Sequence, residues 1–215
     1  MNRKMISLLI AIVSNHGSII YRYASFIMKN IIGVVMCGGE SKRMGSDKGL
    51  MPVQNTIQAK FMADKISFLQ VPVVFSINKY QLKSYSGYIA FEDLIVDENE
   101  LRGPVRGLLS VHTKFPSGDI LLIACDMAEL DADTIKNLLL AYSKEDIYDF
   151  YVYQDEMYAQ PFCGIYTAKG MDKLAGRILS QSLTNISLQN VLNNGVTKRI
   201  AINNKNAFTN LNYKR

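Results

Sequence analysis

The stretch that decides the fold is residues 31–49, which read Ile31-Ile-Gly-Val-Val-Met-Cys-Gly-Gly-Glu-Ser-Lys-Arg-Met-Gly-Ser-Asp-Lys-Gly49. Its first six residues form an apolar run, the pattern of a strand that is buried on both faces of a sheet. The run stops at Gly38-Gly39 and becomes a polar loop that carries two cations, Arg43 and Lys48. Glycines let a backbone approach a ligand closely, and two cations favour a triphosphate over a neutral ligand. The stretch therefore predicts a strand and a phosphate-binding loop, with a ligand-free basic turn as the alternative.

The familiar phosphate-binding patterns do not match this loop. A P-loop has four residues between its glycines, followed by Lys-Ser or Lys-Thr. Here five residues separate Gly39 from Gly45, and Gly49 follows Lys48. The dinucleotide pattern G-x-G-x-x-G is absent as well. The loop therefore points to a different class of nucleotide-binding turn.

Strands and helices alternate after the loop. Further strands are expected at residues 72–78, at 88–91 with 95–96, and at 119–126, and helices at 56–69, from Pro104, and from Asp131 to about Tyr142. Each parallel strand needs a crossover to return. The pattern therefore predicts an α/β fold: a three-layer, doubly wound, Rossmann-like and mostly parallel sheet. Its ligand crevice lies beyond the carboxyl ends of the strands, where the Gly-rich loop, Asn78, Asp97 and Asp126 would meet.

The last third of the chain has a different pattern. Residues 149–153 and 157–166 surround a polar turn and predict an antiparallel hairpin. Helices are expected at 168–179 and 187–193, and a final strand at 197–202. Gln160-Pro161 lies inside the hairpin, where a proline suggests an edge strand.

Composition excludes several function classes. The formal charge of +5 falls to +2 without residues 1–27, because 24 − 3 leaves 21 basic against 19 acidic residues. No basic stripe with interleaved aromatic residues is present, so no nucleic-acid partner is expected. Cys37, Cys125 and Cys163 are widely spaced in apolar stretches and predict reduced thiols. His112 is expected to be structural, so a histidine base is not expected.

Residues 1–27 resemble a signal peptide in having a basic start and a short apolar run. The apolar run is too short to span a bilayer, and no convincing cleavage site follows it. We expect a disordered extension or a misassigned start, with Met28 as the natural start and a single domain over 28–215. The alternatives are an export signal or membrane anchor, and a structured appendage.

The complete loop pattern, Gly-Gly-x-Ser-x-Arg-Met-Gly-x-Asp-Lys, resembles the nucleotidyltransferase loop of the molybdenum cofactor guanylyltransferases (molybdopterin-guanine dinucleotide synthases). Three further segments resemble this family: Cys125-Asp126-Met127, Gly103-Pro104-x-x-Gly107 and Phe208-Thr-Asn210-Leu-Asn212. The resemblance extends from about Ile31 to Asn212.

The resemblance implies transfer of GMP from GTP to molybdenum-molybdopterin, with release of pyrophosphate, in the cytoplasm. It also implies Mg²⁺ as cofactor, with molybdenum-insertion proteins and acceptor apo-enzymes as further partners, and no membrane partner. The alternatives are a molybdopterin cytidylyltransferase, a sugar nucleotidyltransferase and a non-catalytic nucleotide-binding module. Nucleotide preference would separate the first two alternatives from a guanylyltransferase, and measured turnover would exclude a non-catalytic module.

The resemblance assigns roles to individual residues. The expected catalytic residues are Arg43, Lys48 and Asp126, with Asp126 as the metal ligand. By position alone, Asp126 could equally be a helix cap or a turn residue. The expected nucleotide-binding residues are Met36, Cys37, Gly38, Gly39, Lys48, Asn78, Asp97 and Asp126. The expected molybdopterin-binding residues are Gly45, Gly103, Pro104, Asn210 and Asn212.

The chain departs from the family pattern at several positions. Arg106 replaces a residue that is usually small, and is expected either to reach the acceptor's phosphate or to point to solvent. Ala128 stands where the family usually has proline. Gln160-Pro161 resembles a segment near the pterin, and the usual Thr-Pro-Glu ending and an arginine before Ser187 are missing. These differences concern the acceptor half more than the nucleotide half.

Overall fold

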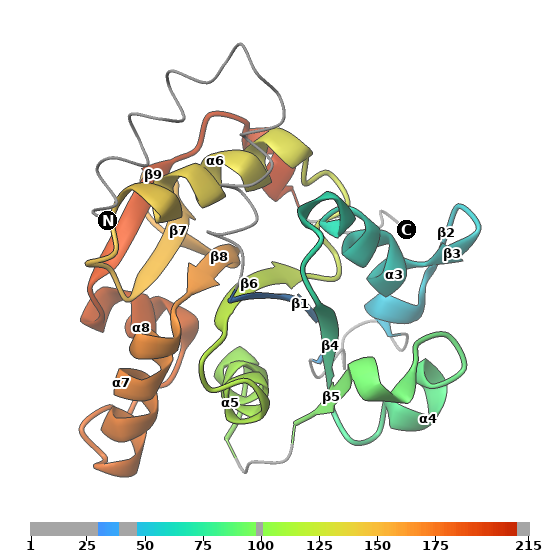
Figure 1. Ribbon diagram of the computed structural model, residues 1–215, viewed down its shortest axis with the longest axis horizontal. Helices are drawn as coiled ribbons and strands as arrows, with labels where there is room; N and C mark the ends of the chain where they lie inside the picture. The colour runs from blue at the N-terminus through green and yellow to red at the C-terminus, as the bar shows by residue number, and fades with distance from the viewer. Residues whose placement is uncertain (1–29, 39–46, 98–100, 210–215) are drawn as a thin grey trace.

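A seven-stranded sheet forms the centre of the computed structural model, which describes residues 30–38, 47–97 and 101–209. Its strand order is β5-β4-β1-β6-β8-β7-β9 (Figure 1). The strands are β1 (Ile31–Met36), β4 (Val73–Ile77), β5 (Leu94–Val96), β6 (Asp119–Ala124), β7 (Phe150–Gln154), β8 (Ala159–Tyr166) and β9 (Thr197–Ala201).

The first half of the sheet is parallel. β1 pairs in parallel with β4 on one side and with β6 on the other, and β5 extends this half beyond β4. The register places Val34 opposite both Val74 and Leu122, so apolar side chains of neighbouring strands stack directly. Strands buried on both faces need such near-continuous apolar runs. The predicted doubly wound, mostly parallel sheet is confirmed.

The second half contains the predicted antiparallel hairpin. β8 pairs antiparallel with both β6 and β7, and β9 then pairs in parallel with β7. The expectation that Pro161 marks an edge strand is wrong, because β8 lies inside the sheet. The register shifts between Val152 and Tyr153, so residues 161–163 have no paired partner on β7. A proline without an N–H group is tolerated at such an irregularity.

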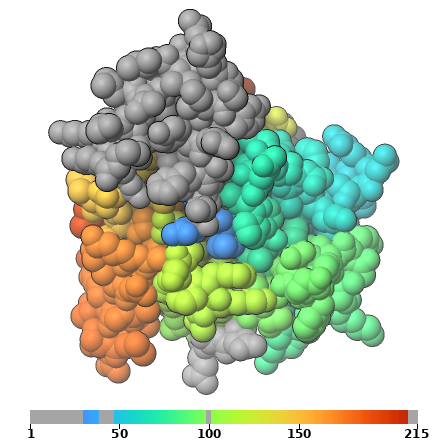
Figure 2. Space-filling model, viewed as in Figure 1, coloured from blue at the N-terminus to red at the C-terminus, as the bar shows by residue number. Residues whose placement is uncertain are grey.

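Helices cover both faces of the sheet (Figure 1). One face carries α3 (Gln58–Asp64) and α6 (Ala132–Lys144), whose apolar residues pack with Ile31 and Val35 of β1. The other face carries α5 (Pro104–Lys114), α7 (Ala168–Leu179) and α8 (Leu188–Asn194), which pack with the alternate β1 residues. Figure 2 shows α7 and α8 in orange and α4 (Leu82–Tyr85) in green on either side of α5. Each fully buried Leu, Ile or Val contributes about 1.5–3 kcal/mol, so both layers stabilise the sheet.

Two expected elements differ from the structure. The single helix expected at 56–69 is instead β3 (Thr56–Ile57), α3 and the 3₁₀ turn η2 (Ser67–Leu69). β3 pairs with β2 (Pro52–Val53) through a tight turn in which Gln54 has a φ of 50°. Residues 88–91 are not extended, and the 3₁₀ turn η3 (Phe91–Asp93) leads directly into β5.

Helix starts follow their expected caps. Asp131 accepts a bond from the Thr134 N–H at 2.7 Å and begins α6, as predicted. Pro104 occupies the first turn of α5, where its missing N–H group costs nothing.

Within the described part of the chain, no helix combines the length and the apolar character needed to cross a lipid bilayer.

Candidate active site

Neighbouring strand ends bring distant parts of the sequence together on one rim of the sheet. Cys37 and Gly38, which follow β1, both donate their N–H groups to the Ser76 carbonyl of β4 at 2.9 Å. The Cys125 N–H after β6 donates to the Met36 carbonyl at 3.1 Å. The last residue of β1 and the first two residues after it are thereby held between β4 and β6.

Gly38 lies against the residues that follow β4 and β5. A Cβ atom at this position would be 3.2 Å from Asp97 Oδ2 and 3.7 Å from the Asn78 nitrogen. The Asp97 N–H donates to the Ile77 carbonyl at 2.8 Å, which extends the β4–β5 pairing to the rim. The rim therefore juxtaposes the start of the Gly-rich loop with Asn78 and Asp97.

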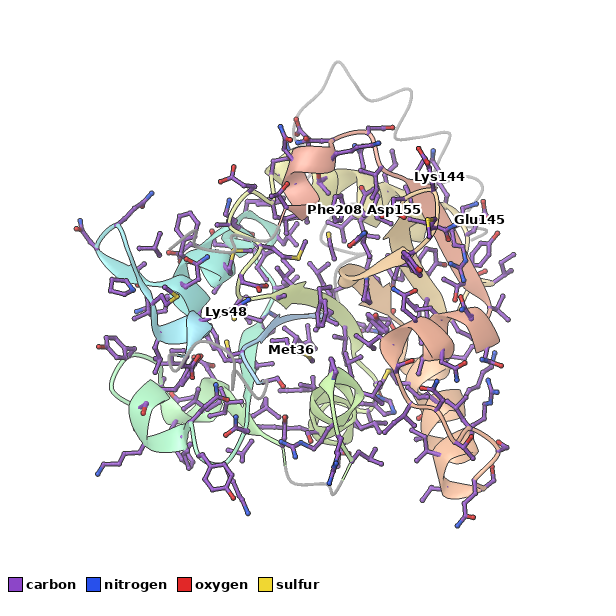
Figure 3. The ribbon with its side chains drawn as sticks, turned by 180° about the vertical axis from the view of Figure 1, so that it is seen from behind. Met36, Lys48, Lys144, Glu145, Asp155 and Phe208 are labelled. Carbon is purple, nitrogen blue, oxygen red and sulfur yellow. The ribbon has the colours of Figure 1, made fainter. Side chains whose placement is uncertain are left out.

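Lys48 and Asp126 form an ion pair across 78 positions of sequence. Lys48 Nζ donates to Asp126 Oδ2 at 2.8 Å, and the two side chains remain 30% and 21% exposed. Lys48 is in the 3₁₀ turn η1 (Lys48–Leu50), and Asp126 follows the end of β6. Figure 3 labels Lys48 together with Met36 near the carboxyl ends of the central strands. The pair presents one cation and one carboxylate to any ligand above the rim.

A hydrogen-bond network that the sequence did not reveal holds the end of the loop. Asp47 Oδ1 accepts bonds from the Gly49 N–H and the Tyr85 hydroxyl, both at 2.9 Å. Asp47 Oδ2 accepts a bond from Gln81 Nε2 at 2.6 Å, and the same amide nitrogen donates to the Cys37 carbonyl at 3.1 Å. Asp47 is therefore a structural acceptor, and its bonds hold the backbone on both sides of Lys48.

Asp97 is a nearly buried carboxylate with two polar neighbours. Its side chain is 6% exposed, and Ser76 Oγ donates to Oδ1 at 3.2 Å. Arg106 Nε lies 3.4 Å from Oδ2. Burial raises the pKa of Asp97, while the charge of Arg106 and the Ser76 hydroxyl act in the opposite direction. Neither expectation for Arg106 describes this contact, because its guanidinium pairs with Asp97.

The remaining described candidates, Asn78, Gly103 and Pro104, shape the backbone at the rim and at the start of α5. Asn78 Oδ1 accepts the Tyr80 N–H at 2.9 Å, and the Asn78 N–H donates to Gln81 Oε1 at 2.8 Å. Asn78 thus shapes the turn between β4 and α4 at the rim. Gly103 precedes α5 with a φ of 76°, a conformation that favours glycine, and Pro104 follows it.

Several candidates lie outside the described residues: Gly39, Arg43, Gly45, Asn210 and Asn212. The described segment nearest to the last two is the 3₁₀ turn η4 (Lys205–Phe208). Phe208 packs against Tyr153 of β7, with ring centroids 5.1 Å apart. Figure 3 shows Phe208 in the same part of the molecule as the β7–β8 turn that contains Asp155.

Three thiols and one histidine complete the candidates. All three cysteines are free and buried, as predicted. Burial, together with the neighbouring Cys125 thiol, raises the pKa of Cys37, so this thiol is a poor nucleophile. His112 Nε2 lies 2.9 Å from Asp172 Oδ1, in a contact between α5 and α7. It has the structural role that was predicted.

The donor set at the rim fits a metal ion that is bound together with a nucleotide. Among the residues that the structure describes, no three His, Cys, Asp or Glu side chains gather in a way that could hold a metal. An ion such as Mg²⁺ is commonly held by one or two carboxylates, waters and the phosphates of the substrate. Asp126 is a partly exposed carboxylate of this kind. The site therefore suits a metal whose other ligands come from phosphate.

Comparison with known proteins establishes the family. The family described as "MobA-like NTP transferase domain" matches residues 33–193. The chain belongs to this family. A molybdenum cofactor guanylyltransferase of Campylobacter jejuni is 24% identical over 84% of this chain and 90% of its own length. A probable molybdenum cofactor guanylyltransferase of Flavobacterium johnsoniae is 24% identical over 86% of the chain and 96% of its own length.

Other members and structures show how widely this NTP transferase fold is shared. A molybdenum cofactor biosynthesis bifunctional protein of Synechocystis is 28% identical over 64% of this chain, but the match spans only 39% of that protein. The molybdopterin-guanine dinucleotide biosynthesis protein A of Archaeoglobus fulgidus has a TM-score of 0.62 at 20% identity, covering 80% of this chain and 83% of that one. A cytidylyltransferase of Leptospira borgpetersenii has a TM-score of 0.59 at 14% identity, covering 81% and 76%. These structures share the fold with this chain, so the fold alone does not identify the nucleotide.

Proposed function

We propose that this protein transfers GMP from GTP to molybdenum-molybdopterin, forming the molybdopterin guanine dinucleotide cofactor and releasing pyrophosphate. The observation that carries the proposal is the Lys48–Asp126 pair, 2.8 Å apart, on the same rim as the first residues of the Gly-rich loop. The guanylyltransferase relatives, which align over most of their length, support guanine as the base.

The chemistry requires positioning and charge neutralisation more than proton transfer. The attacking group is the phosphate of molybdopterin, which is already an anion, so no general base is needed. Such a reaction is accelerated by holding the reactants in line and by fixed charges that face the developing negative charge. A rim that pairs Lys48 with Asp126 and Arg106 with Asp97 places fixed charges where this reaction needs them.

Each candidate has a role in this proposal. Lys48 neutralises the triphosphate, and Arg43 adds a second cation from the loop. Asp126 would hold Mg²⁺, and the ion would supply positive charge to the triphosphate. The proposed nucleotide-binding residues are Met36, Cys37, Gly38, Gly39, Asn78 and Asp97, and the proposed molybdopterin-binding residues are Gly45, Gly103, Pro104, Asn210 and Asn212.

The proposed reaction determines the partners. GTP and molybdenum-molybdopterin are the substrates, and molybdenum-insertion proteins and acceptor apo-enzymes lie before and after this step. We place the reaction in the cytoplasm, where GTP is available.

The first experiment measures nucleotide binding by thermal stabilisation with GTP, CTP, ATP and UTP, each with and without Mg²⁺. A ligand that binds only the native state stabilises it by about 2.7 kcal/mol at a concentration of 100 Kd. We expect a shift that is selective for GTP and larger with Mg²⁺. A preference for CTP would replace the proposal with a cytidylyltransferase, and no shift with any nucleotide would contradict a transferase.

The second experiment measures pyrophosphate release with GTP, Mg²⁺ and molybdenum-molybdopterin. Lys48→Ala should lower turnover by about a hundredfold, the usual loss when one fixed charge-stabilising donor is removed. Lys136→Ala is the matched control, because Lys136 forms an exposed pair with Asp133 at 3.1 Å on α6. Equal activity of both variants would remove Lys48 from the mechanism.

A further inference from the structure

Arg106 is an unusual residue for the first turn of a helix. The positive end of the helix dipole favours acidic residues there, yet the first turn of α5 contains no acidic side chain and carries Arg106. A cation in this position needs compensation from elsewhere. The structure provides it in Asp97, whose Oδ2 lies 3.4 Å from Arg106 Nε.

Two glycines without side chains, Gly38 and Gly107, leave room for the Asp97 carboxylate close to the backbone. A Cβ atom on Gly38 would be 3.2 Å from Oδ2, and one on Gly107 would be 3.3 Å from Oδ1. Ser76 Oγ donates to Oδ1 at 3.2 Å from the neighbouring strand. β1, β4 and α5 thus all approach the carboxylate, but of the described groups that act on it only Arg106 carries a charge.

We propose that Arg106 is a positioning residue for the nucleotide: it holds the Asp97 carboxylate as an acceptor for the N–H or O–H donors of the nucleoside. The proposal rests on the proposed function, because it assumes that a nucleoside triphosphate occupies this rim. It goes beyond that function in assigning part of the nucleotide affinity and selectivity to a residue that acts through Asp97.

The chemistry of a carboxylate explains why Arg106 is needed. An ionised carboxylate only accepts hydrogen bonds, whereas a protonated one also donates. Burial raises the pKa of Asp97 and so favours the protonated form, and Arg106 opposes this effect. Without Arg106, the side chain would lose its orientation and the pKa of Asp97 would rise further.

Two parts of the nucleoside can supply the donors. Guanine offers N1–H and a 2-amino group on one edge, and the ribose offers its 2′- and 3′-hydroxyl groups. Inosine triphosphate lacks only the 2-amino group, and the 2′-deoxy and 3′-deoxy forms of GTP each lack one hydroxyl. The Kd values of these four nucleotides therefore show whether the 2-amino group or one of the two hydroxyls contributes to the contact.

The test compares Kd values for Mg²⁺–GTP in the full chain and in Arg106→Ala, Arg106→Lys, Asp97→Asn and the Arg106→Ala/Asp97→Asn double variant. Arg102→Ala is the matched control, since it removes the same charge from an exposed position four residues away. We expect Arg106→Ala to weaken GTP binding by roughly tenfold or more, because a hydrogen bond from the nucleoside to a charged acceptor is lost when Asp97 is no longer held in place. Arg106→Lys should recover part of the loss, and Arg102→Ala should change the Kd by less than about twofold.

Selectivity and coupling separate positioning from a merely structural role. Wild type should discriminate GTP from at least one of the three analogues, and Arg106→Ala should lose that discrimination. Arg106→Ala should cost little more when Asp97 is already Asn, because the two substitutions interrupt the same interaction. The loss should appear in KM for GTP, with kcat at saturating GTP nearly unchanged.

The outcomes distinguish the two proposals. Wild type that binds GTP without discriminating among the analogues would overturn the role of Arg106, and so would an equal loss in both Asp97 backgrounds. Wild type that binds no nucleotide would overturn the proposed function and this inference together. If Arg106→Ala unfolds at the assay temperature, Arg106→Gln, which keeps a long polar side chain, serves for the same comparison.

Discussion

Replacing Gly107 with alanine tests how closely α5 approaches the nucleotide side of the rim. Gly107 lies in the first half of α5 and is buried. A Cβ atom there would overlap Ser76 Oγ, and would lie 3.1 Å from Met36 Cε and 3.3 Å from Asp97 Oδ1. The added methyl group must therefore displace the hydroxyl that donates to Asp97, and it also crowds Met36 and the Asp97 carboxylate.

The expected loss can be worked out from three effects. Alanine gains about 1 kcal/mol of helix propensity over glycine. Overpacking in a close-packed interior costs about 1–3 kcal/mol, and the lost hydrogen bond to a carboxylate costs about 1.5–3 kcal/mol. The net loss is therefore about 3 kcal/mol, which lowers the Tm of a chain of this size by about 6–12 °C.

The matched control is Gly176→Ala, which makes the same change in α7. Apart from its chain neighbours and the backbone of its own helix, nothing lies within 4 Å of a Cβ added at Gly176, so only helix propensity changes. This variant should gain about 1 kcal/mol and about 2–4 °C in Tm. Thermal denaturation without nucleotide measures both variants, and GTP titration should show weaker binding only for Gly107→Ala. A Gly107→Ala protein as stable as Gly176→Ala would refute the close contact of α5 with Ser76.

Three further predictions concern buried or capping groups. Tyr85→Phe removes the hydroxyl that donates to Asp47 at 2.9 Å, and urea denaturation should show a loss of about 1–2 kcal/mol. The stability of Asp97→Asn relative to wild type should increase as pH rises above 3.8. Burial raises the pKa of Asp97, so the folded state binds the proton more tightly than the unfolded chain does, and wild type loses stability as this proton leaves. Asp131→Asn should show the opposite trend. Burial disfavours the charge of Asp131, but hydrogen bonds from Thr134 and Asn204 outweigh it and lower the pKa, so its stabilisation is present above 3.8 and is lost as pH falls. Urea unfolding from about pH 3 to pH 7 compares the last two.

The strands that carry the rim could be predicted because each has a strong local signal. β1 is the apolar run Ile31–Met36, and it ends where the glycines begin. α7 spans Ala168–Leu179, the predicted range, because its apolar residues have helical spacing after the capping Thr167. Parallel strands align their carboxyl ends, so the positions of Asp97 beside Gly38 and of Asp126 beside Lys48, at the two described ends of the loop, followed from topology alone.

The side-chain network could not be predicted in the same way. α4 has only four residues, too few to produce a periodic pattern, yet it carries the Tyr85 hydroxyl that bonds to Asp47. Residues 88–91 have the apolar composition of a strand, but Tyr88 and Phe91 are exposed. Short elements are determined by their tertiary contacts more than by local propensity. The Arg106–Asp97 pair likewise depends on the distance between α5 and β5, which no local pattern reports.

The β4–α4 segment therefore has a larger role in the site than its sequence indicates. The described residues on both sides of the Gly-rich loop bond to it: Gly38 to the Ser76 carbonyl, and Asp47 to Gln81 and Tyr85. Because Lys48 follows Asp47 directly, this segment also helps determine where the lysine lies relative to Asp126. A substitution in α4 should thus affect the rim without touching a nucleotide. If Tyr85→Phe lowers GTP affinity while the Lys48→Ala protein keeps its Tm, the network positions the cation that the chemistry uses, and packing and function are coupled through Asp47.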